Sequence, residues 1–240
     1  MNILFNTILF IIGIVVGSFW AAKVKQISKS FNIGKAYYDN PKVEVLSKLT
    51  YIVIGGISSV ILANVFNINI HKFDISNLII YIFAMIYIST LIIIAGIDKY
   101  YLTIEKRVLA FGIISSIMYM LYLCIIDLAS VYLNGIYLVI YIGLLLIDTF
   151  LLRKYAKDSY IINTLLLLCV ILVYTDLNTL IHTISMAFIA IVLYSLLLKS
   201  QQKKNGNKKI KISEIPVGYF IAASNIIVLF MIRIFENYCI

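Results

Sequence analysis

The sequence predicts an all-α membrane protein, a bundle of about eight transmembrane helices with both termini outside. Hydrophobic residues make up 62% of the 240 residues and charged residues only 13%, whereas soluble domains are about half apolar and a quarter charged. Several apolar runs approach or exceed the roughly 20 residues that cross a bilayer. Basic residues gather in alternate loops, as topology rules require. Because lipid cannot hydrogen-bond to the backbone, each run is expected to be a helix.

The expected helices follow one another with short polar breaks. No linker is long enough to separate domains, so residues 1–240 are expected to form one integral-membrane domain. The first run has no basic residue ahead of it and continues too far for a signal peptide, which predicts a retained span. The spans are expected at about residues 3–22, 49–68, 78–97, 108–126, 136–152, 160–174, 180–198 and 215–234.

Charge sets the orientation of these spans. The polar segment 23–48 and the basic loop 199–214 carry six lysines each, and the loops after the third and fifth spans carry three basic residues each. Eighteen of the 20 basic residues thus lie on one side, and only Lys72 and Arg233 lie opposite. The positive-inside rule places all four loops in the cytoplasm of a multi-pass plasma-membrane protein. Orientation accounts for the net charge of +9 without a nucleic-acid partner, and the bilayer is the expected surrounding.

Two aspartates stand where spans meet the predicted cytoplasmic side. Asp98 closes the third span and Asp158 opens the sixth, so both are expected at one membrane depth. Ionisable residues at that depth are functional candidates. A close carboxylate pair does not readily lose both protons, and one protonated and one ionised carboxyl activate water in aspartic proteases. The alternative is two unrelated loop aspartates, solvated or paired with Lys99 and Lys157.

Other chemistries have less support in the sequence. No CxxC occurs, and His71 and His182 have no second ligand at helical spacing, so no metal site is expected. No nucleotide motif predicts a cofactor. Asp148 inside the fifth span leaves open an ion or proton site of a small transporter. Close helix packing, more than function, is predicted for the small residues of the second span, Gly55, Gly56, Ser58 and Ser59.

Five short motifs then follow one another along the chain. Val16-Gly17-Ser18-Phe19 ends the first span, and Asn40-Pro41-Lys42-Val43-Glu44-Val45-Leu46-Ser47 precedes the second. Ile97-Asp98 is followed at a fixed spacing by Ile104-Glu105-Lys106-Arg107-Val108. Asp158-Ser159-Tyr160-Ile161 and Glu214-Ile215-Pro216-Val217-Gly218-Tyr219-Phe220-Ile221-Ala222 open later spans. In this order they resemble the motifs of the type IV prepilin peptidases, membrane aspartic endopeptidases of type IV pilus and protein secretion systems.

The resemblance implies a reaction and its residues. Asp98 and Asp158 would be the catalytic pair, one as base toward water and the other as acid on the scissile carbonyl. The implied substrate and partner is a pilin-like precursor with a basic leader ahead of a hydrophobic helix, cut at their junction at the cytoplasmic membrane face. Glu44 matches an acidic position of the family and would bind the basic leader.

Some family features are replaced. Tyr155-Ala156-Lys157 stands where the family has Gly-x-Gly before the second aspartate, and Glu105 replaces a proline. The zinc-binding cysteine pairs of the family are missing, and Trp20-Ala21 stands where an asparagine is expected. No cofactor is therefore expected, and S-adenosylmethionine enters only if the family's methyltransferase activity is kept. A catalytically impaired paralogue that serves as a membrane assembly component remains the alternative function.

Overall fold

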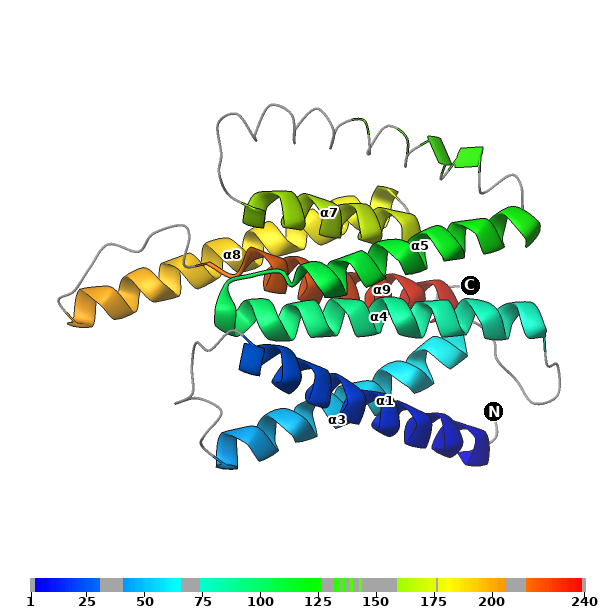
Figure 1. Ribbon diagram of the computed structural model, residues 1–240, viewed down its shortest axis with the longest axis horizontal. Coiled ribbons are helices and arrows are strands. Elements are labelled where there is room, and N and C mark those ends of the chain that lie inside the picture. The colour runs from blue at the N-terminus through cyan, green and yellow to red at the C-terminus, as the bar shows by residue number, and fades with distance from the viewer. Residues whose placement is uncertain are drawn as a thin grey trace. The chain divides into compact units, whose positions relative to one another are not determined.

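The computed structural model of the chain is all-α (Figure 1). It describes residues 3–30, 41–65, 74–126, 132–133, 135–136, 139, 143, 159–175, 177–205 and 215–238. Within these residues the helices are α1 (Ile3–Ser30), α3 (Pro41–Val65), α4 (Ile75–Tyr101), α5 (Lys106–Ile126), α7 (Ser159–Tyr174), α8 (Leu177–Asn205) and α9 (Val217–Tyr238). They coincide with seven of the eight expected spans, and the fifth lies almost entirely outside the described residues.

Four of the described helices are long and apolar enough to cross a membrane. They are the segments Phe5–Ser28, Ile75–Tyr101, Lys106–Ile126 and Leu177–Ser200. Three shorter apolar helical segments, Lys48–Asn64, Tyr160–Tyr174 and Val217–Ile232, accompany them. The length and composition of these helices support a membrane protein.

Helices extend into the polar segments 23–48 and 199–214, which the sequence predicts to be loops. In the segment 23–48, α1 continues to Ser30 and α3 begins at Pro41. In the segment 199–214, α8 continues to Asn205. Lysine and glutamine are good helix formers, and proline is favoured at the first helical position, so the backbone hydrogen bonds continue after the apolar run has ended.

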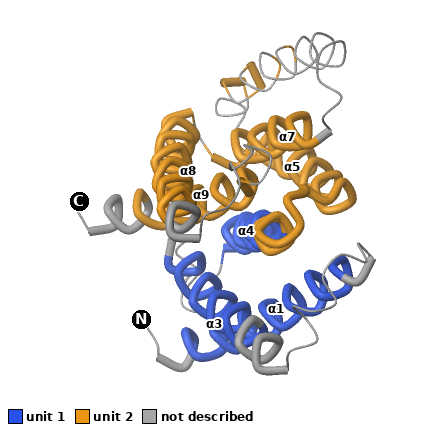
Figure 2. Tube along the Cα trace, turned by 90° about the vertical axis from the view of Figure 1, so that its left-hand side faces the viewer, with its two compact units in different colours: residues 1–93, 233–240 blue, residues 94–232 orange. Residues whose placement is uncertain are grey.

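The described chain divides into two compact units (Figure 2). The first contains residues 1–93 and 233–240, and the second contains residues 94–232. The first unit therefore holds α1, α3 and most of α4. The last two turns of α4 belong to the second unit together with α5, α7, α8 and most of α9.

Glycines bring α1 and α3 into backbone contact in the first unit. A Cβ on Gly13 would lie 2.3 Å from the Gly55 carbonyl oxygen, and one on Gly17 would lie 2.3 Å from the Tyr51 carbonyl oxygen. Moving four residues forward in α1 thus moves four residues back in α3, which is an antiparallel register. Small residues at such an interface allow two backbones to approach closely. The close packing predicted for the second span is confirmed.

A buried hydroxyl pair extends this register. The Ser59 hydroxyl donates to the Leu9 carbonyl oxygen at 2.8 Å, and it also lies 2.7 Å from the Tyr81 hydroxyl oxygen of α4. Ser59 is fully buried. These hydrogen bonds tie α1, α3 and α4 together where apolar contact alone is only weakly directional.

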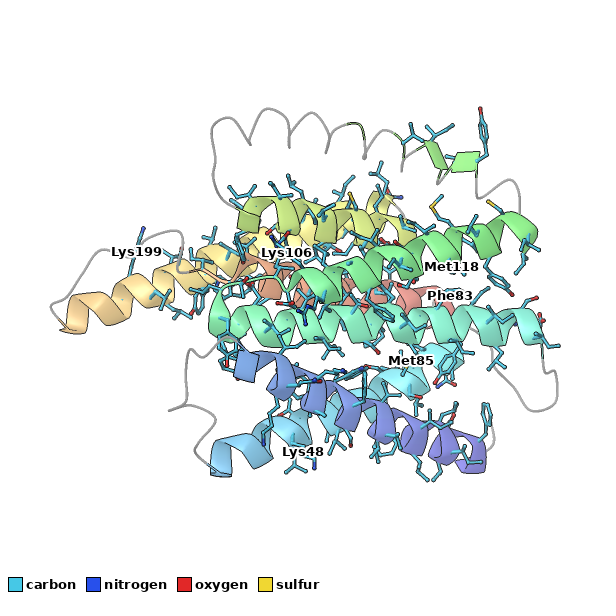
Figure 3. All side chains as sticks on the ribbon, viewed as in Figure 1. Lys48, Phe83, Met85, Lys106, Met118 and Lys199 are labelled. Atoms are coloured by element: carbon cyan, nitrogen blue, oxygen red, sulfur yellow. The ribbon has the colours of Figure 1, made fainter. Side chains whose placement is uncertain are left out.

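The described helices of the second unit run in two opposite directions. Figure 1 shows α4 ending at the same end of this unit at which α5, α7 and α9 begin and α8 ends. Lys106 and Lys199 lie toward that end in Figure 3. Buried polar contacts also cross between its helices: the Tyr174 hydroxyl donates to Ser115 Oγ at 3.0 Å, and Asn225 Nδ2 donates to Thr183 Oγ1 at 3.0 Å.

Candidate functional site

Asp98 occupies the last full turn of α4, where the sequence predicts the end of a span. Its side chain is completely buried, at 0% exposure, and Ile94, Ile97 and Ile104 nearby in the chain are buried as well. A buried carboxylate needs hydrogen-bond donors to offset the loss of water. The reading of Asp98 as a solvated loop aspartate is therefore wrong.

The start of α9 supplies one set of these donors. The first amide groups of a helix have no partner within it, and Pro216, just before α9, has no N–H to satisfy. The Val217 N–H donates to the Ile215 carbonyl oxygen at 2.9 Å, and the helical ladder begins with Phe220 donating to Pro216. The Tyr219 N–H donates to Asp98 Oδ2 at 2.8 Å. Asp98 thus lies at the positive end of the α9 dipole, where a carboxylate is stabilised.

Tyr160, in the first turn of α7, completes the contacts of the same oxygen. Its hydroxyl donates to Asp98 Oδ2 at 3.0 Å and accepts from the Gly218 N–H at 3.2 Å. A tyrosine hydroxyl has one proton to give, so accepting from Gly218 directs that proton to Asp98. Three helices, α4, α7 and α9, therefore meet in one hydrogen-bond network.

The turn after α4 packs against this network. Leu102 has a φ of 51°, which places it in the left-handed region, and its N–H still donates to the Asp98 carbonyl oxygen at 3.0 Å. The turn brings Ile104 inward, and the Ile104 carbonyl oxygen accepts from Asn163 Nδ2 at 3.1 Å. Asn163 lies one helical turn after Tyr160, so one face of α7 holds both the carboxylate and the turn.

Gly218 leaves the room that this arrangement needs. A Cβ at that position would lie 3.0 Å from Asp98 Oδ2 and 2.9 Å from Ile104 Cδ1. A side chain at this position would press on both the Asp98 carboxylate and the Ile104 side chain. The absence of a side chain at residue 218 thus allows the α9 amides to approach Asp98.

The second carboxylate oxygen of Asp98, Oδ1, has a different hydrogen-bonding environment. Oδ1 is buried and has no hydrogen-bond partner among the residues that the structure describes. Lys99 does not serve as its counter-ion, because the Lys99 ammonium group lies over the Tyr100 ring at 5.4 Å and the Tyr219 ring at 5.7 Å from their centroids. A buried polar atom without a partner calls for an explanation, and a role in catalysis is one of those that apply.

The other predicted site residues are only partly covered by the structure. Asp158 lies outside the described residues, and α7 begins at the next residue, Ser159. Glu44 lies in the first turns of α3, and its side chain is outside the described part. Asp148 lies outside the described residues as well. The structure therefore describes Asp98 and its donors, and the pairing of Asp98 with Asp158 and Glu44 stays a prediction.

Sequence reasoning gave no role to Tyr160, Gly218 or Tyr219. One signal for the two α9 residues is present in the sequence: Pro216 predicts a helix start, whose first amides are free to bind an anion. For Tyr160 the signal is its place two residues after Asp158. Neither signal predicts a contact with Asp98. Tyr160 is 62 residues and Tyr219 is 121 residues away from Asp98 in the sequence, and only the fold brings them together.

Comparisons with protein-family models, curated proteins and solved structures find no match to this chain.

Proposed function

We propose that this protein is a membrane-embedded aspartic endopeptidase that removes the basic leader from type IV pilin-like precursors. Asp98 and Asp158 form the catalytic pair. In this proposal the chain crosses the plasma membrane eight times, with both termini outside and the catalytic pair at the cytoplasmic face. The order of the sequence motifs supports the reaction class, and the setting of Asp98 supports the site.

One observation carries the proposal. Asp98 is completely buried at the end of an apolar helix, its Oδ2 is held by two donors, and its Oδ1 has no partner among the described residues. A carboxylate that only stabilised the fold would be expected to use both oxygens, since an unsatisfied buried acceptor costs about 1–3 kcal/mol. Because no described residue uses Oδ1, this oxygen is assigned in the proposal to the attacking water.

The reaction follows from two carboxyl groups in different protonation states. Asp98 Oδ1 takes a proton from a water molecule as the water oxygen bonds to the scissile carbonyl carbon. Protonated Asp158 donates its proton to the carbonyl oxygen, giving a neutral tetrahedral diol. Asp98 then passes the proton it took from water to the amide nitrogen as the C–N bond breaks, and the Asp158 carboxylate takes a proton from one hydroxyl of the diol. This releases a carboxylic acid and an amine and returns both aspartates to their starting states. No cofactor or metal is required for these steps.

The substrate class is the one that the motif resemblance implies, and the position of the site suits it. A pilin-like precursor carries a basic leader directly before a hydrophobic helix, so the helix stays in the bilayer while the junction lies at the membrane surface. The described helix α4 ends at Tyr101, one turn after Asp98, which suits a junction at that depth. Glu44 would bind the basic leader by charge attraction.

A second candidate function rests on the same contacts. Asp98 also caps the first amides of α9, and a cap stabilises a helix without any catalysis. A non-catalytic paralogue that acts as a membrane assembly component would keep Asp98 for this reason alone. The two functions differ in whether the carboxylate chemistry of Asp98 is needed.

Replacing Asp98 with asparagine separates them. The amide oxygen of Asn can still accept from the Tyr219 N–H and the Tyr160 hydroxyl, so the cap of α9 is kept while the base is lost. We expect Asp98→Asn to fold as the wild type does and to lose cleavage of a co-expressed pilin precursor by a factor of about 10³ or more. Asp158→Asn should have the same effect. Cleavage is measured by the mobility of the precursor and mature pilin on gels.

Asp74 provides the matched control. It is exposed at the start of α4, where its Oδ1 accepts from the Ser76 N–H at 2.9 Å, and asparagine caps a helix as well as aspartate does. Asp74→Asn should leave cleavage unchanged. Full processing by Asp98→Asn would refute the peptidase and favour the assembly component, for which capture of pilus or secretion proteins by both Asp98→Asn and the wild type is the positive test.

A further inference from the structure

We propose that Tyr160 is a positioning residue for Asp98: it holds Oδ2 so that Oδ1 is the oxygen that receives the proton of the attacking water. This inference rests on the proposed function and adds a residue to which the motif pattern gave no role. Tyr160 would not touch the reacting atoms and would act only through Asp98.

Counting donors and acceptors supports this assignment. Asp98 Oδ2 receives the Tyr219 N–H at 2.8 Å and the Tyr160 hydroxyl at 3.0 Å. Tyr160 is itself fixed by the Gly218 N–H at 3.2 Å. Both donors to Asp98 approach the same oxygen from different helices, so a proton on the neutral form of Asp98 has its place on Oδ1.

Two donors are needed to fix the orientation of the Asp98 carboxylate, because its χ2 torsion has only a broad energy minimum and the group rotates easily. The Tyr219 N–H alone would hold one oxygen while allowing the group to swing about that contact. The second donor, from α7, fixes the plane of the carboxylate. Removing the Tyr160 hydroxyl would therefore loosen the carboxylate and also leave the Gly218 N–H without its acceptor.

The rest of α7 is held independently of this hydroxyl. Asn163 binds the Ile104 carbonyl oxygen at 3.1 Å, and Leu167, Val170 and Ile171 are completely or almost completely buried. A phenylalanine at residue 160 keeps the ring and its volume. Tyr160→Phe is thus expected to fold and to change the orientation of Asp98.

Tyr174 offers a matched control on the same helix. Its hydroxyl donates to Ser115 Oγ at 3.0 Å, and its ring stacks on Tyr119 with centroids 4.8 Å apart. Tyr174→Phe removes a hydrogen-bonded tyrosine hydroxyl from α7, as Tyr160→Phe does, but it leaves the contacts of Asp98 intact. Any effect seen only in Tyr160→Phe therefore comes from Asp98.

The experiment measures kcat and KM of the purified full-length protein in detergent with a pilin-like precursor, together with the infrared band of the Asp98 carboxyl. That band is identified as the one lost in Asp98→Asn. We expect Tyr160→Phe to lower kcat about tenfold or more, since small misplacements at a reacting centre are costly, with KM within about twofold. The Asp98 band should move in Tyr160→Phe. Tyr174→Phe should change neither quantity.

The outcomes separate this inference from the proposed function. If Asp98→Asn abolishes cleavage while Tyr160→Phe matches Tyr174→Phe in kcat and in the Asp98 band, the positioning role is overturned and the peptidase stands. A fall in kcat without a band shift, or a band shift without a fall in kcat, also overturns the positioning role. If Asp98→Asn still cleaves, the proposed function fails and takes the inference with it.

A second substitution covers the case in which Tyr160→Phe does not fold. Incorporation of 3-fluorotyrosine at residue 160 keeps the hydroxyl and changes the strength of its hydrogen bond to Asp98. The Asp98 band should then shift and kcat should change with it. An unchanged band and an unchanged kcat in this protein would overturn the positioning role.

Discussion

Gly13→Ala tests the backbone contact between α1 and α3. The added Cβ would lie 2.3 Å from the Gly55 carbonyl oxygen, 2.7 Å from the Gly55 carbonyl carbon and 2.7 Å from the Gly56 Cα. All three are backbone atoms, so no side chain can rotate away. Ordinary contact begins at 3.4 Å, and the helices must therefore move apart locally by about 1 Å to admit one methyl group.

The expected loss of stability follows from this displacement. Overpacking typically costs about 1–3 kcal/mol, and the upper part of that range applies here because the opposing atoms belong to the backbone. Alanine returns about 1 kcal/mol through its better helix propensity. We expect a net loss of about 2 kcal/mol in the free energy of unfolding, which lowers the folded-to-unfolded ratio about 30-fold.

The chain carries its own probe for this measurement. Trp20, the single tryptophan, lies in α1 two turns after Gly13 and is 0% exposed. Titration of the detergent-solubilised protein with a denaturing detergent should expose it, and its emission should move to longer wavelength. The midpoint for Gly13→Ala should come at a lower detergent fraction than that of the wild type.

Gly143→Ala is the matched control. Gly143 is helical, and a Cβ there would meet no heavy atom of the described residues within 4 Å. Its substitution should leave the midpoint unchanged or raise it. The packing argument is refuted if Gly13→Ala and Gly143→Ala have the same midpoint, or if Gly13→Ala is as stable as the wild type.

Two further substitutions test the surroundings of Asp98. Leu102→Gly should change stability by less than about 1 kcal/mol, because relief of the left-handed backbone is offset by the entropy cost of glycine and by loss of a side chain that is only 36% exposed. The denaturation midpoint measures this, and a large shift would contradict it. Gly218→Ala should change stability by less than about 1 kcal/mol, since the far end of Ile104 can move and alanine favours the helix. It should lower the proposed cleavage about tenfold because the Asp98 carboxylate must shift by a few tenths of an ångström. Unchanged cleavage by Gly218→Ala would show that the close approach at residue 218 is not needed.

The positions of the helices could be predicted because a transmembrane run is a local property of the chain. About 20 apolar residues predict a span wherever they occur, and seven of the expected spans are helices in the structure. The residues at which the helices end are predicted less accurately. Lysines mark where the hydrocarbon should end, but they do not stop a helix, so α1 and α8 continue beyond the predicted boundaries.

Only part of the candidate site could be predicted, because the acceptor is recognisable in the sequence and its donors are not. Asp98 is notable in the sequence because a carboxylate at the end of an apolar helix is expensive. Its donors are not, since a backbone amide of residue 219 has no chemical signature of its own. Tyr160 resembles any other of the 18 tyrosines until the fold brings it to Asp98. Sequence patterns thus identified the acceptor, and only the packing of α4, α7 and α9 identified its donors.

The network at the start of α9 also bears on how the protein is made. Asp98 and Tyr160 are synthesised well before residues 218 and 219, whose amides they satisfy. In a bilayer those amides have no water to bind, so the last helix is stable at its final depth only when α4 and α7 are already in place. The formation of the site and the docking of the last helix are therefore one step. A chain that stops before residue 215 would lack both the Tyr219 donor of Asp98 and the last helix, which couples completion of synthesis to formation of the Asp98 network.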